Sequence, residues 1–347
     1  PITQILYETQ ETESTAAFFQ YERNVTEKLA LTVGARWTEE EKHFIAGQAY
    51  LSSVAAQRNR QFIGYADLNN KWDETSLKFG ATYELDENRM IYASFSEGFH
   101  SGGFFGVNQN IRDFERDQYD PEYATSIELG FKSMMLDNRL RFNVAAFRNE
   151  FEDKQESFVK IDPDTKTVAS VFDNAAEVLY EGIEVEILYA ATRDLRLFFN
   201  GGWLDANYEE FTTDITPTDG VVNVVDASFL EPRNAPEYTL GLGFNFTKQI
   251  GAGEMELFAK YTKIADFQTD VLNLNAGRTA SGNSEDLSAT IGYYFGDYSI
   301  SLYGKNLTDE QIEWPVLLGG SPTSGVLFAA GTITRGRHLG IEFTAEF

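Results

Sequence analysis

The chain has 347 residues, of which 42% are hydrophobic, and its 54 acidic and 28 basic residues give a formal net charge of −26. A surface this acidic repels the phosphate backbone and excludes nucleic acid as a partner. The absence of cysteine excludes disulfides and thiolate metal sites, and no run of about 18 apolar residues is present to form a transmembrane helix.

The aromatic content is high, at 14%, with 28 Phe and 17 Tyr, although the mean hydropathy is only −0.33. Strands of a membrane barrel combine these properties, because they alternate lipid-facing apolar residues with polar ones and carry aromatic residues at both interfaces. Composition alone leaves open one large β domain or two ordinary ones.

Residues 1–13 are polar and irregular, and we interpret them as a loop. A strand over about 14–23, a turn over 24–28 and a second strand to about residue 42 follow. One face of the second strand is apolar: Leu29, Leu31, Val33, Ala35 and Trp37. The opposite face is polar: Thr32, Arg36, Thr38 and Glu40.

The same separation of apolar and polar parities recurs over residues 74–85, 183–189 and 287–295. A Lys or Arg on the lipid face at the bilayer midplane costs about 2–4 kcal/mol, so charges in a membrane strand keep to the lumen face. A half-exposed sheet of a soluble β-sandwich would also show this parity, so parity alone does not decide between the two.

Connection lengths favour the membrane barrel. Thirteen strands are predicted, and short and long connections alternate between them, which places all tight turns at one end, as in bacterial outer-membrane barrels. The short connections are 24–28, 86–88, 136–138, 192–194, 249–253 and 296–297. The long ones are 43–71, 98–121, 152–175, 210–235, 265–284 and 306–334.

The last strand, residues 335–347, resembles the closing strand and assembly signal of outer-membrane barrels, with an apolar parity formed by Leu339, Ile341, Phe343, Ala345 and Phe347. Thirteen is odd, whereas single-chain bacterial barrels have even strand numbers. Together with a start at Pro1 that has no signal segment, this predicts further strands upstream.

Several stretches together resemble the TonB-dependent outer-membrane receptor family over nearly the whole chain from about residue 11. They are YASFSEGFHSGG (92–103), residues 119–155, residues 174–211 with GIEVEI (182–187), and KNLTDE (305–310). The resemblance implies an all-β, antiparallel, up-and-down transmembrane barrel of 22 strands with a plug in its lumen. Residues 1–347 would form its last thirteen strands, and the first nine strands and the plug would be absent from this sequence.

On this resemblance we expect an outer-membrane transporter for a scarce nutrient, most often an iron–siderophore complex, which needs no cofactor and performs no covalent chemistry. Implied partners are the TonB energy-transducing complex, contacted through the missing amino-terminal part, a small-molecule ligand, and outer-membrane lipid and lipopolysaccharide. Uptake of carbohydrate or cobalamin, a passive porin or structural barrel that docks a partner protein, and a soluble β-sandwich module remain alternatives.

The long connection 98–121 holds the candidate ligand-binding residues His100, Phe104, Phe105, Arg112 and Arg116. Its glycines lack the strand-to-helix context of a phosphate loop. We expect Phe104 and Phe105 to be exposed in the loop, where they would either hold an organic ligand or pack onto a neighbouring loop. The three histidines are too far apart in sequence to indicate a metal site.

A second long connection, 210–235, is acidic, with only Arg233 as a counter-charge. It favours either a cationic or metal-bearing ligand, a solvated surface, or contact with lipopolysaccharide through divalent cations. The carboxylates of Glu184, Glu186 and Glu342 are expected to face the lumen, where they would meet the plug or water.

Overall fold

The computed structural model describes residues 2–52, 61–104, 118–161, 168–214, 224–269, 271, 284–310, 313–321, 326–333 and 335–346. Throughout these residues the chain forms β-strands, turns and irregular segments. They contain no helix long and apolar enough to cross a membrane.

Thirteen strands follow one another along a single curved sheet, and every neighbouring pair is antiparallel. In order they are β1 (Ile2–Asn24), β2 (Leu29–Ser52), β3 (Gln61–Asp86), β4 (Arg89–His100), β7 (Glu122–Met135), β8 (Leu140–Ile161), β9 (Val168–Ala190), β10 (Leu195–Asp214), β12 (Tyr238–Ile250), β13 (Gly253–Ile264), β14 (Ser284–Phe295), β15 (Tyr298–Lys305) and β18 (His338–Ala345). The sheet is open, because β1 and β18 do not pair with each other.

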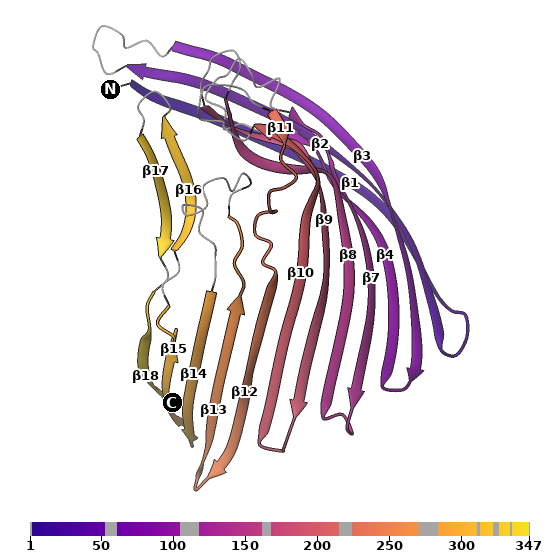
Figure 1. The fold of residues 1–347 in the computed structure, drawn as a ribbon, viewed down its shortest axis with the longest axis vertical. Helices are drawn as coiled ribbons and strands as arrows, with labels where there is room; N and C mark the ends of the chain where they lie inside the picture. Colours follow the sequence, from indigo (N-terminus) through magenta and orange to yellow (C-terminus); the bar gives the residue numbers. More distant parts are fainter. Residues whose placement is uncertain are drawn as a thin grey trace.

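Five further strands lie within the connections at one end of the sheet. β5 (Gly103–Phe104) pairs with β6 (Gln118–Tyr119), β11 (Val224–Asp226) pairs with the end of β10, and β16 (Glu313–Ser321) pairs with β17 (Val326–Ile333). Figure 1 shows the tight turns gathered at the lower end of the sheet and the long connections at the upper end. The predicted alternation of short and long connections is therefore confirmed.

The convex face of the sheet carries a continuous apolar belt. The cross-strand row Val33, Phe79 and Phe95 illustrates it, and the belt continues through every later strand to β18. Its exposed members include Leu31, Val33, Phe79, Ile127, Leu129, Ile183, Trp203, Leu242, Ile291, Ile300, Leu302, Leu339, Ile341 and Phe343. An exposed apolar surface of this extent is far beyond that of a soluble monomer and matches a lipid-facing band.

The concave face is polar, and four of its aromatic rings lie across a glycine on the neighbouring strand. The directly paired residues are Tyr92 and Gly130, Phe147 and Gly182, Phe198 and Gly243, and Tyr303 and Gly340. A Cβ atom at each of these glycines would collide with the ring opposite. The glycines therefore make room for the rings against the neighbouring strand.

Several strands are longer than the sequence predicts. Residues 2–13 belong to β1, which pairs with β2 in unbroken register from Ile2 and Ser52 onward, so the prediction of a loop there is wrong. β2, β3, β8, β9 and β10 likewise extend into the predicted long connections. The apolar parity stops at the edge of the lipid belt, but backbone pairing continues beyond it, because hydrogen bonding between strands does not depend on lipid contact.

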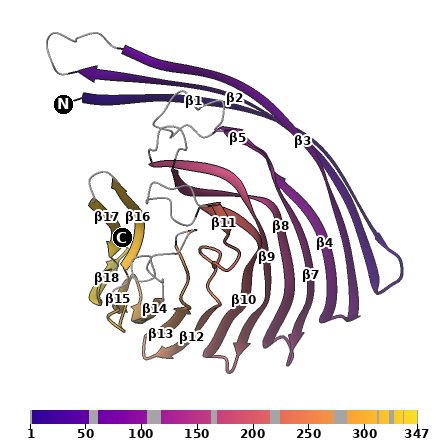
Figure 2. The same cartoon turned by 45° about the horizontal axis from the view of Figure 1, so that its top comes forward.

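Figures 1 and 2 show that β1, β2 and β3 continue past the upper edge of the other strands and arch over the concave side. β3 pairs with β4 only from Lys78 and Ser96 down to Asp86 and Arg89, whereas its pairing with β2 continues far above this point. The wall therefore divides at its upper edge into an overhanging sheet of β1–β3 and a second sheet that begins at β4.

Candidate functional site

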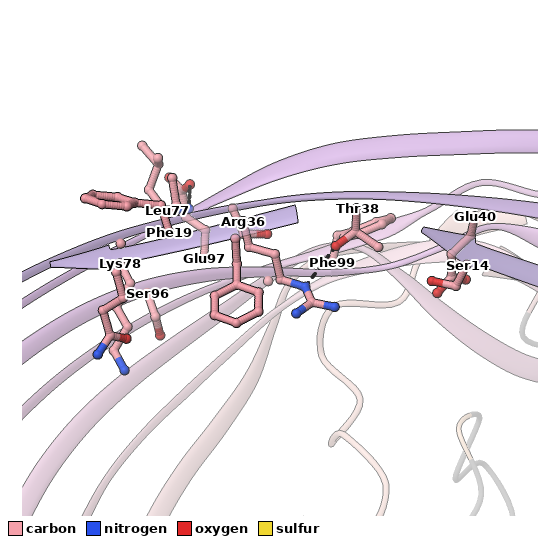
Figure 3. Close-up of a pocket in the computed structure, with 16 residues that line it drawn as sticks. Ser14, Phe19, Arg36, Thr38, Glu40, Leu77, Lys78, Ser96, Glu97 and Phe99 are labelled. Carbon is pink, nitrogen blue, oxygen red and sulfur yellow. Dashed lines mark hydrogen bonds between the residues drawn. The ribbon is translucent and has the colours of Figure 1, made fainter. Parts of the chain in front are cut away.

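The candidate site is the concave upper end of the sheet, where the long connections fold inward. A hollow of about 480 Å³ lies there on the wall formed by β1–β4. Figure 3 shows Arg36, Lys78 and Ser96 extending to one side of this wall, whereas Phe19 and Leu77 extend to the opposite side. The hollow thus presents a guanidinium and an ammonium group beside hydroxyl groups, and the carboxylates of Glu40 and Glu97 also line it.

The division between β3 and β4 is bridged by side chains rather than by strand pairing. Just above the last β3–β4 pair, the backbone N–H of Leu77 donates to a Glu97 carboxylate oxygen at 3.0 Å. The Ser101 hydroxyl donates to Glu40 at 2.5 Å, and Lys42 Nζ donates to the Gly102 carbonyl at 2.7 Å. Burial lowers the pKa of Lys42. The segment that follows β4 therefore ties the overhanging sheet to the rest of the wall.

Phe104 completes this attachment. Its ring stacks on Phe44 at a centroid distance of 5.7 Å and lies 6.1 Å from the Trp72 ring, and only 7% of the residue is exposed. Our expectation that Phe104 is exposed is therefore wrong. The strands β2 and β3 extend far enough to provide an apolar surface for the ring, and that extension is the feature that the sequence pattern does not predict.

Below this segment, two amide side chains donate hydrogen bonds to backbone carbonyl groups at the ends of several strands. Gln155 Nε2 donates to the carbonyls of Ser101 and Asp120 at 3.2 and 2.9 Å. Asn174 Nδ2 donates to the carbonyls of Asp120 and Asp153 at 2.8 Å each. Backbone carbonyls that emerge from strand ends need partners when they are buried, and these amides supply them.

A second inward-folded segment, residues 227–237, packs on β9 and β10. A β-bulge on β10 makes this possible: Tyr208 pairs with Val178 and Glu210 with Glu177, so Glu209 has no counterpart. The extra residue turns Phe211 to the same side as Tyr208, and their rings stack at 4.6 Å. The resulting apolar cluster consists of Ala176, Val178, Tyr208, Phe211, Ala227, Leu230 and Val271.

A buried ion pair fixes this segment to β8. The Glu156 side chain is only 2% exposed, and its carboxylate lies 2.9 Å from Arg233 Nη2 and 3.8 Å from Lys154 Nζ. Burial raises the pKa of the Glu156 carboxyl, and the charges of Arg233 and Lys154 only partly oppose this effect. Adjacent residues of β8 thus hold two different inward-folded segments, Gln155 the first and Glu156 the second.

Because its pKa is raised by burial, Glu156 should make stability depend on pH. The unfolded carboxyl titrates near 4.5, so between that pH and its higher folded pKa the folded protein binds more protons than the unfolded protein. The free energy of unfolding should therefore fall as pH rises through this window. We expect urea unfolding midpoints at pH 4.5 and 7 to differ more in the wild type than in Glu156→Gln, whereas equal pH dependence would contradict this assignment.

Of the candidate ligand-binding residues, the structure describes His100 and Phe104, which are four positions apart in the sequence. His100 is exposed at the end of β4, and its carbonyl accepts a hydrogen bond from Gln155 Nε2 at 3.4 Å. Phe105, Arg112 and Arg116 lie outside the described residues, as do Asp219 of the acidic connection and the terminal Phe347.

The other charged residues lie where their parity predicts. Glu184, Glu186 and Glu342 occur on the concave face, and Glu186 accepts a hydrogen bond from Asn143 Nδ2 at 2.7 Å. Leu339, Ile341 and Phe343 of the final strand lie on the convex belt. In the part of the chain that the structure describes, no three His, Asp or Glu side chains are grouped so that they could hold a metal ion.

No sequence pattern marks Glu156, Gln155 or Phe229 as residues of the mouth, the concave upper end of the sheet. Phe229 is 69% exposed on the second inward-folded segment, although its neighbours Ala227 and Leu230 are buried. The available signal in the sequence was Arg233, which is the one basic residue of the acidic connection. Its ion-pair partner, Glu156, lies more than 70 positions earlier in the chain. Local sequence contains no information on that pairing.

Comparison with known proteins places these features in a family. A family model described as "TonB dependent receptor-like, beta-barrel" matches residues 2–307. The probable TonB-dependent siderophore receptor PiuA of Acinetobacter baumannii is 30% identical over 180 residues, which cover 50% of this chain and 21% of that protein. The ferric-pyoverdine 358 receptor of Pseudomonas putida is 30% identical over 109 residues, or 31% of this chain and 12% of that receptor.

Solved structures share the fold. The ferric yersiniabactin uptake receptor FyuA of Yersinia pestis superimposes with a TM-score of 0.73 at 16% identity, covering 100% of this chain and 47% of FyuA. The ferric-catecholate import receptor Fiu of E. coli K12, in its closed form, gives a TM-score of 0.66 at 18% identity, covering 98% of this chain and 45% of Fiu. The sequence match covers about a fifth of the length of PiuA, and the chain spans less than half of these two solved receptors.

Proposed function

Because this chain belongs to the TonB-dependent receptor-like β-barrel family, whose barrels lie in the outer membrane, we propose that its protein takes up iron–siderophore complexes from outside the cell. The observation that carries the proposal is the match to siderophore receptors both in sequence and in fold. Two features of the structure support the proposal. One is the apolar belt of lipid-facing side chains. The other is the set of inward-folded segments that pack on the wall at the end opposite the tight turns.

In this proposal the ligand binds at the mouth without covalent chemistry, and the energy for passage comes from the TonB complex. The remainder of the protein contributes nine further strands, which complete a barrel of 22, and a plug in the lumen. The glycines opposite Tyr92, Phe147, Phe198 and Tyr303 make room for these rings against the neighbouring strand, which suits a wall that surrounds a plug. The outer rim contacts lipopolysaccharide.

Uptake of radioactive iron tests the proposal. Cells that depend on the intact protein should accumulate iron from at least one ferric siderophore of a panel, and this uptake should stop when the gene is deleted or when TonB is removed. Uptake that persists without TonB would instead indicate a passive porin. Binding of cobalamin or a carbohydrate with no ferric complex bound would indicate another nutrient.

A further inference from the structure

The edge of β3 that faces the division between the two sheets is capped by side chains. Backbone groups of alternate residues in a strand point to the same side, so the odd-numbered residues of β3 direct their N–H groups toward the edge where β4 pairs lower down. Three of these N–H groups donate to side-chain oxygens: Leu77 to Glu97 at 3.0 Å, Thr75 to Glu74 at 2.9 Å and Lys71 to Asn70 at 2.8 Å. A free edge would offer such groups to another strand. The division is therefore a stable feature of the sheet.

Above the division, β1, β2 and β3 form one continuous overhanging sheet. β1 pairs with β2 up to the pair of Ile2 with Ser52, and β2 pairs with β3 up to the pair of Tyr50 with Gln61. Backbone ladders therefore hold the overhanging sheet together internally. Across the division, β3 contacts β4 through the side chain of Glu97 rather than through strand pairing.

The segment that follows β4, residues 101–104, contacts the overhanging sheet through polar and charged groups. The Ser101 hydroxyl donates to Glu40 at 2.5 Å, and Lys42 Nζ donates to the Gly102 carbonyl at 2.7 Å. The same ammonium group lies 5.6 Å from the centroid of the Trp72 ring. Ser101 is 2% exposed and Lys42 is 7% exposed, so these contacts are shielded from water.

Aromatic packing adds to the attachment. The Phe104 ring stacks on Phe44 at 5.7 Å and lies 6.1 Å from the Trp72 ring. A Cβ atom at Gly102 would lie 2.7 Å from the Trp72 indole and 2.4 Å from the Tyr119 carbonyl oxygen. The segment thus fits closely against the concave side of β2 and β3.

The same segment is bound to the other sheet by β8. Gln155 Nε2 donates to the Ser101 carbonyl at 3.2 Å and to the Asp120 carbonyl at 2.9 Å. The Gln155 N–H in turn donates to a Glu122 carboxylate oxygen at 2.8 Å. Residues 101–104 therefore lie between the two sheets and contact both of them.

We propose that residues 101–104 are a strap that sets the position of the overhanging sheet, and that release of the strap lets the upper parts of β1–β3 move as one unit relative to the wall. Side-chain contacts across the division open more readily than the backbone ladders within each sheet. The strands would bend at the level of Lys78 and Ser96, where β3 leaves β4. Because the overhanging sheet arches over the concave side (Figure 2), its position sets how widely the mouth is open, whatever nutrient the protein takes up.

Distances between two spin labels on the intact protein, purified from outer membranes in detergent, test the strap. The labels are attached at Glu13→Cys on the overhanging sheet and at Asp205→Cys on β10, both of which are exposed positions. We expect one narrow distance distribution with the strap intact. Phe104→Ala and Lys42→Met, introduced separately, should each increase its width about twofold or more, because each removes a contact of the strap.

Phe211→Ala is the matched control, because it removes a fully buried ring that packs against the second inward-folded segment. The width should not change in this variant. Hydrogen exchange distinguishes movement from unfolding: amides of residues 101–104 should exchange about tenfold faster or more in the strap variants, whereas those of residues 5–15 in β1 should stay within about threefold of the wild type.

Three results would overturn the proposal. The first is an unchanged width in the strap variants, and Lys42→Met decides this if Phe104→Ala does not fold. The second is broadening together with loss of protection in β1, because the overhanging sheet would then unfold rather than move as a unit. The third is equal broadening in Phe211→Ala, which would show a general loosening of the wall.

Discussion

Substitution of Gly243 with valine is expected to prevent normal assembly of the wall. A Cβ at position 243 would collide with the Ala259 carbonyl oxygen on β13 as well as with the Phe198 ring. A ring can rotate, but the backbone oxygen of a paired strand cannot move without breaking the ladder. We therefore expect Gly243→Val to cost about 3 kcal/mol or more of folding free energy, at or beyond the upper end for overpacked sites.

Gly130 provides the comparison, because the nearest atoms to a Cβ there all belong to the Tyr92 ring. Gly130→Ala should be rescued by Tyr92→Ala, whereas Gly243→Ala should not be rescued by Phe198→Ala. The measurement is the fraction of intact protein that migrates as folded barrel on unheated gels, with urea unfolding of the folded fraction. Equal rescue at both positions would contradict the role given to the Ala259 carbonyl.

The second large effect concerns the buried ion pair. Arg233→Gln removes the principal partner of Glu156, whose side chain is only 2% exposed, and leaves Lys154 at 3.8 Å as partial compensation. Breaking a buried pair by removing one partner costs about 3–5 kcal/mol, and we expect a value near the lower end because Arg233 itself is partly exposed. The loss should appear as faster hydrogen exchange in residues 227–237 at pH 7.

A double-mutant cycle measures the interaction energy between Glu156 and Arg233. Combining Glu156→Gln with Arg233→Gln should destabilise residues 227–237 less than the sum of the single changes, because the double variant buries no unpaired charge. The cost of Arg233→Gln should also be smaller at pH 4.5 than at pH 7, because burial raises the pKa of the Glu156 carboxyl and the isolated group takes up a proton as the pH falls. Additive effects at both pH values would show that Glu156 and Arg233 are not coupled.

The sequence predicts the membrane wall well and its upper extension poorly. Within the lipid belt each strand must separate apolar from polar side chains, so residues such as Leu31 and Val33 reveal both the strand and its orientation. Above the belt both faces meet water or other protein, and strands such as the first half of β1 carry no parity signal. Their existence depends on pairing partners that are distant in sequence.

The candidate site shows the same limit. Phe104 is buried only because β2 and β3 extend beyond the belt to reach it, and Phe211 faces inward only because a bulge shifts β10 by one residue. Arg233 stands out in its acidic connection, but Glu156, its ion-pair partner, lies far away in the sequence on β8. Periodicity locates strands, whereas these contacts depend on register, bulges and loop folding.

The orientation of the wall in the outer membrane is the claim on which the rest depends, and single-cysteine labelling tests it most directly, because the chain has no cysteine of its own. Intact cells would be treated with a bulky, membrane-impermeant maleimide. We predict that Phe229→Cys at the mouth is labelled, whereas Asp137→Cys in a tight turn is labelled only after the outer membrane is opened. Labelling of Asp137→Cys but not Phe229→Cys in intact cells would contradict the account.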